Sequence, residues 1–319
     1  QLVAYGAQDI YLTGNPQITF FKVVYRRHTN FSMETIQQTI SGSSTLSGST
    51  STGTVTISRN GDLVHKVYVT SSTPGIQNGD NIVQEVELEI GGQKIDKQTK
   101  EWMQVWEELN TPGGDKDTLK HMKHAQILGH QHLTTELTAT TAHNAVGMVQ
   151  IPLRFWFCRN PGLALPLIAL QYHEVKLKFT WGVSTAIPAG AANFETSVAG
   201  TVTDCEAACK VWCDYIYLDT DERRRFAQVS HEYLIEQVQE QSTSGATSNK
   251  LNFNHPVKEL IWTDTVNTDY VDAKLQLNGH DRFAAQEEEY FQLRQPYEYH
   301  TSTPTTNVVP VRSAKRGFW

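Results

Sequence analysis

Long apolar segments, cysteines and positive charge are all scarce in this 319-residue sequence. No run of about 18 apolar residues occurs and no signal peptide is visible, so the sequence predicts no membrane-spanning helix. Four cysteines are too few for a disulfide framework in a chain of this length, which favours a reducing compartment. The formal net charge is -7, and such a chain lacks the positive field that nucleic-acid binders use. We therefore predict no direct contact with nucleic acid.

Small polar residues and aromatic residues are plentiful, and they indicate β-sheet. Aromatic residues make up 10 % of the chain and hydrophobic residues 39 %, whereas charged residues are only 19 %. Together with many Ser, Thr, Asn, Gln and Gly, this composition suits sheets with polar loops better than a helical bundle. The length exceeds the size at which one hydrophobic core usually stops growing. Two domains are the first interpretation, and one large β domain is the alternative.

Alternating apolar residues predict strands over much of the first 218 residues. The regions are 31–40, 54–69, 82–96, 149–157, 175–181 and 211–218. Asn60-Gly61 and Gly91-Gly92 each predict a two-residue hairpin turn between such strands. Between residues 85 and 89, three alternating glutamates mark a face in contact with water, so the opposite face of that strand is predicted to be core.

A helix and a domain connector interrupt this pattern. Trp102, Val105 and Leu109 fall at helical spacing, and Pro112 ends the predicted helix. Residues 219–225 break the apolar pattern and are interpreted as a connector between domains. Strand patterns restart beyond it at 233–238, 250–253, 259–262 and 273–277.

The two parts of the chain echo each other in sequence. TISRNGDLVHKVYV is followed by VELEIGGQKID in the first part, and KLNFNHPVKELIWT is followed by AKLQLNGHDRF in the second. Each part has a strand, a turn containing Asn, a second strand, and then a strand that runs into a Gly-containing turn. A repeat of this length indicates a duplicated domain. We therefore predict an all-β fold of two tandem jelly-roll sandwiches, with short helices in the loops.

One segment has the spacing of a metal site. His130, His132 and Glu136 form the H-x-H-x3-E core of the metal motif in cupins, which are small β-barrels. The residues that flank this core do not follow the cupin pattern. The alternative interpretation is thus a cupin-like metal-binding enzyme, or a carbohydrate-binding jelly-roll protein.

Several longer segments together resemble one protein family. The segments are residues 6–31, 56–64, 86–97, 161–177, 214–228, 231–239, 251–258 and 275–283. In this order they are similar to the major capsid protein of large icosahedral nucleocytoplasmic DNA viruses, of the phycodnavirus and giant-virus type. Residues 99–150 and 182–203 match poorly, as expected of variable loops.

The resemblance implies a structural role and no enzyme activity. It implies a double jelly-roll subunit that forms a homotrimer, a pseudo-hexagonal capsomer of an icosahedral shell. The implied location is the capsid shell of the virion, assembled in the host cytoplasm. The implied partners are copies of the chain, neighbouring capsomers, minor capsid proteins and a nearby inner viral membrane. No cofactor is predicted.

The resemblance also divides the chain into an arm and two domains. Residues 1–24 are predicted to form an N-terminal arm, 25–219 the first jelly roll, and 220–319 a second jelly roll that is shorter than in the family. The residues predicted to act in assembly are Phe20, Phe21, Val23, Val24, Arg26 and Arg27. The four apolar side chains supply an anchor, and the two arginines meet an acidic surface on a neighbour or on membrane lipid. The alternative is that residues 18–25 form a first core strand.

Overall fold

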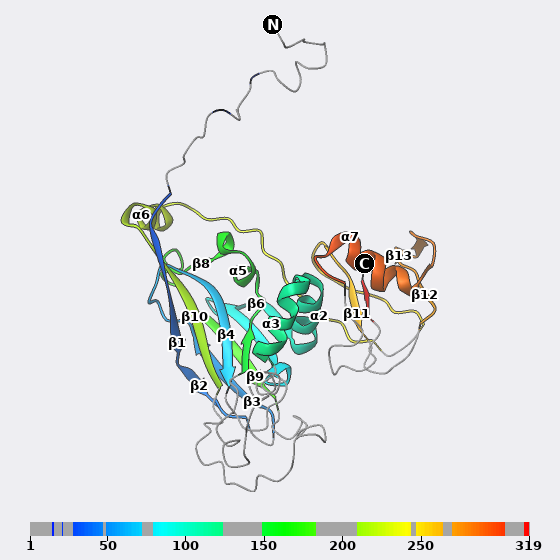
Figure 1. The fold of residues 1–319 in the computed structure, drawn as a ribbon, viewed down its shortest axis with the longest axis horizontal. Coiled ribbons are helices and arrows are strands. Elements are labelled where there is room, and N and C mark those ends of the chain that lie inside the picture. The colour runs from blue at the N-terminus through cyan, green and yellow to red at the C-terminus, as the bar shows by residue number, and fades with distance from the viewer. Residues whose placement is uncertain are drawn as a thin grey trace.

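In the computed structural model of the chain, the structure describes residues 15, 21, 28–46, 49–71, 79–123, 149–182, 209–243, 247–263, 270–303 and 316–318. The strands of the first 218 residues form two antiparallel sheets of five strands each (Figure 1). Sheet A contains β1 (Phe31–Gln38), β4 (Leu63–Ser71), β7 (Val149–Pro152), β8 (Leu165–Pro166) and β10 (Cys209–Leu218). Sheet B contains β2 (Ile40–Gly42), β3 (Ser51–Thr56), β5 (Val83–Ile90), β6 (Gln93–Thr99) and β9 (Val175–Trp181).

The order of the strands is that of a jelly roll. Sheet A has the order β1-β10-β4-β7, with β8 paired to β4, and sheet B has the order β2-β3-β9-β5-β6. The chain crosses repeatedly from one sheet to the other, so neighbours within a sheet are distant in sequence except for β2-β3 and β5-β6. The first and last strands, β1 and β10, pair along their whole common length from Phe31↔Leu218 to Gln38↔Val211.

The core lies between the two sheets and follows the predicted alternation. In β9, Val175, Leu177, Phe179 and Trp181 are buried, while the residues between them are half-buried or exposed. The rings of Phe179 and Trp181 stack with centroids 4.8 Å apart. In β10, the buried face includes Cys209 and Cys213, both free thiols. Burial raises the pKa of Cys209 to about 11, so this thiol stays neutral and packs as a small apolar side chain.

The Asn60-Gly61 hairpin prediction is wrong. β3 ends in sheet B and β4 begins in sheet A, so the turn between them carries the chain from one sheet to the other. A Cβ atom on Gly61 would lie 2.8 Å from the Cβ of Tyr215. Glycine is therefore needed here for the close approach to β10 and not for a hairpin.

The Gly91-Gly92 hairpin prediction is confirmed. β5 and β6 are antiparallel neighbours, and the two glycines have φ angles of 60° and 83°. Both angles are in the left-handed region that a type I′ turn requires. On the outer face of β5 each glutamate pairs with a lysine of a neighbouring strand, as in Glu85–Lys97 at 2.7 Å.

Short helices close the ends of the first sandwich. They are η1 (Gly79–Asn81), α2 (Lys100–Asn110), α3 (Gly113–Lys123), α5 (Trp156–Arg159), η3 (Pro161–Leu163) and α6 (Thr220–Gln228). α2 confirms the predicted helix, and the side chain of Thr99 caps its first turn. The strand predicted for 149–157 ends early, because after Leu153, whose N–H still donates to the Val67 carbonyl, the chain turns into α5. No helix in the described ranges is long and apolar enough to cross a membrane.

A buried ionic cluster joins α2 and α3 to the sandwich. The Lys123 ammonium contacts the carboxylates of Asp80 and Glu107, and Glu107 also meets Arg154 at 3.4 Å. Burial alone would lower the pKa of Lys123, but the two carboxylates outweigh it and raise that pKa, so the lysine stays charged. Each charge is thus compensated within the protein, as buried charges must be.

The predicted connector forms α6 instead of an irregular linker. Asp219 accepts the Thr220 N–H at 2.7 Å at the start of the helix, and Arg225 lies in its last turn. Acidic residues near the first turn and a basic residue in the last both suit the helix dipole. α6 follows the end of β10, where Leu218 pairs with Phe31 at the start of β1 (Figure 1).

The second half has shorter strands than the sequence predicts. After α6, residues 229–243 form an extended segment, here called the strap, without strand pairing, so the predicted strand 233–238 is wrong. No strand forms at 250–253 either. The strands are β11 (Ile261–Thr263), β12 (Asp272–Ala273), β13 (Gln276–Leu277), β14 (His280–Asp281), β15 (Gln286–Glu287) and β16 (Arg316–Phe318). They pair as β11-β16, β12-β15 and β13-β14.

Two helical elements and a small aromatic cluster complete this half. The elements are η5 (Tyr290–Arg294), a π-helical turn, and α7 (Gln295–Tyr299). Phe291 is buried, and its ring meets Trp262 edge to face at 5.2 Å. Ile261 packs against Val105 and Leu109 of α2, which brings the second half against the first sandwich (Figure 1).

Candidate assembly surfaces

The residues predicted to act in assembly are mostly outside the described ranges. Phe20, Val23, Val24, Arg26 and Arg27 are not described, and Phe21 is 97 % exposed. His130, His132 and Glu136 of the metal alternative also lie outside the described residues. Among the residues that the structure describes, no group of three or more His, Cys, Asp or Glu side chains is placed to hold a metal ion.

Asp62 brings together two of the segments on which the family resemblance depends, here called the signature segments. It is 7 % exposed and follows the Asn60-Gly61 turn. One carboxylate oxygen accepts the Leu218 N–H at 2.8 Å and an Arg223 N–H at 2.9 Å, and the other oxygen lies 2.9 Å from Arg223 Nε. This bidentate pair fixes α6 to the end of β10. The segments 56–64 and 214–228 therefore meet at one end of the first jelly roll.

Arg59 and Gly91 bring two more segments to the same end. The Arg59 guanidinium donates to the backbone carbonyls of Leu170, Gln171 and His173. The Gly91 N–H donates to the Glu174 carbonyl at 2.9 Å. A Cβ on Gly91 would lie 2.6 Å from Nδ1 of His173, so the hairpin and the loop are in close contact. Segments 86–97 and 161–177 are thereby held beside 56–64.

The strap is fixed to this end of the sandwich by side chains. Asp96 accepts the Val238 N–H at 2.9 Å, and Gln237 donates to the carbonyl of Ile95. Glu236 pairs with Arg159, whose guanidinium lies 3.7 Å from the ring centroid of Trp106. Asp96 is buried, and this desolvation raises the pKa of its carboxyl in spite of the hydrogen bonds that it accepts.

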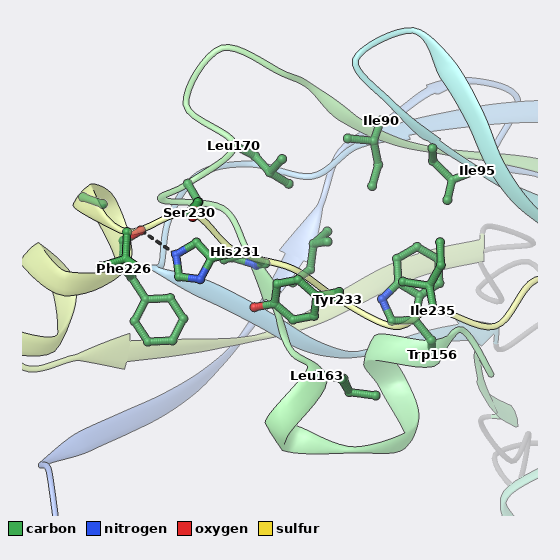
Figure 2. A pocket seen from close by; sticks show the side chains of 15 residues that line it. Ile90, Ile95, Trp156, Leu163, Leu170, Phe226, Ser230, His231, Tyr233 and Ile235 are labelled. Carbon is green, nitrogen blue, oxygen red and sulfur yellow. Dashed lines mark hydrogen bonds between the residues drawn. The ribbon is translucent and has the colours of Figure 1, made fainter.

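A cavity of about 450 Å³ lies between the strap and the sandwich (Figure 2). Side chains from β5, β6, α5 and the loop after it form one wall, and residues 226–235 form the other. His231 stacks on Phe226 at 5.0 Å and contacts its carbonyl through Nε2. Burial raises the pKa of Tyr233, which keeps its hydroxyl neutral. The lining is largely apolar, which suits packing of one segment on another rather than catalysis.

The outer face of sheet A was not recognised from the sequence as a surface. In β1, Phe31 is 65 % and Met33 is 52 % exposed. Further along the same face, the rings of Tyr68 and Trp212 stack with centroids 6.4 Å apart. The alternation in residues 31–40 correctly predicts a strand. It does not predict that the first five residues of β1 are exposed on both faces of the strand.

Comparison with known proteins identifies the family. A model of the "Major capsid protein N-terminus" family matches residues 19–219, and a model of the "Large eukaryotic DNA virus major capsid protein" family matches residues 222–273. The chain belongs to this family of capsid proteins. Its first half is the part in which the signature segments meet around Asp62 and Arg59.

Individual relatives agree with this assignment. The capsid protein is 52 % identical to the major capsid protein of Pyramimonas orientalis virus, over 98 % of this chain and 78 % of the relative. It is 43 % identical to that of Phaeocystis pouchetii virus, over 85 % of this chain and 59 % of the relative. It is 41 % identical to that of Paramecium bursaria Chlorella virus 1, over 93 % and 77 %.

A solved structure extends the match to the fold. A chain of the PBCV-1 virus capsid superposes with a TM-score of 0.68 and 35 % identity, over 94 % of this chain and 80 % of that chain. The predicted double jelly-roll class is confirmed by this match. The protein is thus a structural component of the capsid shell of a large DNA virus. Its relatives are named for a structural role, which favours such a role over an enzymatic one.

Proposed function

We propose that three copies of this chain assemble into a pseudo-hexagonal capsomer, and that capsomers tile the icosahedral shell. In this proposal, residues 25–219 are one jelly roll, residues 220–319 contribute to the second, and residues 1–24 form an arm. The match to a capsid chain over 94 % of the sequence is the observation that carries the proposal. Neighbouring capsomers, minor capsid proteins and an inner membrane are the expected partners.

The exposed apolar side chains of the second half support an assembled state. Leu234 is 92 %, Val271 82 %, Tyr297 81 % and Tyr299 72 % exposed in the single chain. Large apolar side chains that are exposed in a single chain are available for contacts with other copies, and contiguous apolar surfaces mark such contacts. Interfaces between permanent subunits are apolar in the same way.

Light scattering of the purified chain, combined with elemental analysis, tests this proposal. A mass near three times that of one chain, without stoichiometric metal, is the expected result. A monomeric mass with stoichiometric Fe, Mn or Zn that is lost in His130→Ala would instead support the cupin-like alternative. A monomer without metal at all concentrations would contradict the trimer.

A further inference from the structure

Among the described strands, β1 forms one edge of sheet A. The sheet order places β10 on one side of β1, and no described strand pairs with its other side. The register with β10 runs without a shift from Phe31 to Gln38, so β1 is a regular strand of eight residues. A regular open edge presents a row of N–H and C=O groups to any chain that can pair with it.

The sequence of β1 has no lysine, proline or bulge, which are common protections of an open edge. Natural proteins place lysine, proline or a bulge on open edge strands. FSMETIQQ contains no lysine or proline, and its single charge, Glu34, accepts a hydrogen bond from the Tyr217 hydroxyl at 3.0 Å. Phe31 and Met33 add exposed apolar surface beside the edge. An edge of this kind is suited to pairing, as in β-strand addition.

The sequence just before β1 has the properties of a matching strand. Residues 18–25, ITFFKVVY, are eight residues long, like β1, and are rich in β-branched and aromatic types. Phe21 is 97 % exposed in the single chain. Arg26 and Arg27 follow, and they complement exposed Glu34 in charge.

We propose that the open edge of β1 in one copy receives residues 18–25 of a neighbouring copy as an added strand. This inference rests on the proposed assembly, because it names the surface to which the arm binds. Main-chain hydrogen bonds give the affinity, and the apolar side chains of the arm pack beside Phe31 and Met33. The arm thus links subunits through a sheet rather than through a membrane.

Binding of a synthetic peptide tests the edge independently of assembly. The peptide spans residues 14–29 and is titrated into the full chain at a dilution at which the chain is monomeric. Hydrogen exchange of residues 31–38 is followed by mass spectrometry. The expected result is saturable slowing of exchange in β1, with at least tenfold weaker binding to Met33→Lys. Tyr172→Lys, which replaces another exposed apolar side chain far from β1 in sequence, is the matched control and should bind normally.

Three results would overturn the inference. The first is slow hydrogen exchange of β1 already in the dilute chain, with no further change when the peptide is added. This result indicates that β1 pairs with the arm of the same chain. The second is peptide that binds anionic vesicles but not the chain. The third is an assembled shell in which β1 exchanges as fast as in the monomer. In contrast, a chain that never forms trimers but binds the peptide at β1 would contradict the proposed function and leave the edge site intact.

Discussion

At the scale of residues, side chains of the signature segments form hydrogen bonds between parts of the chain that are distant in sequence. Asp62 and Arg59 flank the Asn60-Gly61 turn, and they hold α6 and the loop at 170–173 respectively. The sequence predicts the turn between them. The two charged residues are the ones that make the long-range contacts, and nothing in their spacing identifies these partners.

Replacing Asp62 by alanine should destabilise the first jelly roll. The change leaves the Leu218 N–H without its acceptor and removes the bidentate partner of Arg223. A loss of about 1–3 kcal/mol in the free energy of unfolding is expected for such a buried, charge-assisted group. Urea unfolding followed by fluorescence measures it. Arg223→Ala should cost less, because its side chain is 50 % exposed, and Arg224→Ala should have no effect. Equal losses in all three variants would contradict this role of Asp62.

Asp96 should give the stability a measurable pH dependence. Burial raises the pKa of this carboxyl in the folded chain, so the folded state holds its proton more tightly than the unfolded state. The contribution of Asp96 to stability is therefore present at low pH and is lost as pH rises from about 4 through the raised pKa. Asp96→Asn cannot titrate, so its free energy of unfolding relative to wild type should increase from pH 4 to pH 7. A difference that stays constant or decreases in urea titrations would contradict this assignment.

At the scale of elements, two similar turn sequences have different outcomes. Gly91-Gly92 joins neighbouring strands of one sheet, and the Asn278-Gly279 turn between β13 and β14 repeats the geometry with φ angles of 54° and 79°. This matches the echo in the sequence between the two halves. Asn60-Gly61 instead joins different sheets, because tertiary packing against Tyr215 decides the direction of the chain. Local turn chemistry predicts that a turn forms, but not which strands it pairs.

The two glycines of the β5-β6 hairpin should differ in their tolerance of alanine. Both have positive φ, so alanine costs about 1 kcal/mol at either position. A Cβ at Gly92 meets nothing within 4 Å, whereas one at Gly91 would press on His173. Gly91→Ala should therefore lose more unfolding free energy in urea titrations than Gly92→Ala. The difference should disappear in a His173→Ala background, and its persistence there would contradict the contact.

The strap shows why some strand predictions fail. Tyr233 and Ile235 are two positions apart, as on one face of a strand, and both line the cavity against the sandwich, while Leu234 between them is 92 % exposed. Side chains of the sandwich, such as Asp96 of β6, hold the strap, and among the described residues no backbone forms a ladder with it. An apolar residue at every second position indicates that one face of an extended segment is buried. It does not indicate whether the segment pairs with a neighbouring strand through its backbone or is held by side chains alone.

At the scale of the whole molecule, the sequence predicts the first jelly roll well and its assembly surfaces poorly. Most strands of both sheets follow from alternation, because each has one face in a shared core, whereas the two-residue strand β8 (Leu165–Pro166) is not predicted. Whether β1 has an open edge depends on its position as the outermost strand of the sheet. Alternation within a strand does not indicate that position. Residues 18–25 remain a predicted arm, with a core strand as the alternative.

Deletion of residues 1–24 separates the arm from the core. The shortened chain should keep its folded first jelly roll and its trimeric mass in light scattering, because the described core begins beyond this segment. It should fail to form shells in electron micrographs. Loss of the cooperative unfolding transition on deletion would instead show that residues 18–25 belong to the core and would contradict the arm.

Electron microscopy of purified virus particles tests the central claim most directly. If each chain contributes two jelly rolls, three copies place six jelly rolls around one axis. The reconstruction should then show pseudo-hexagonal capsomers with three copies of this chain in each. Capsomers built from six copies, or from one copy, would contradict the account.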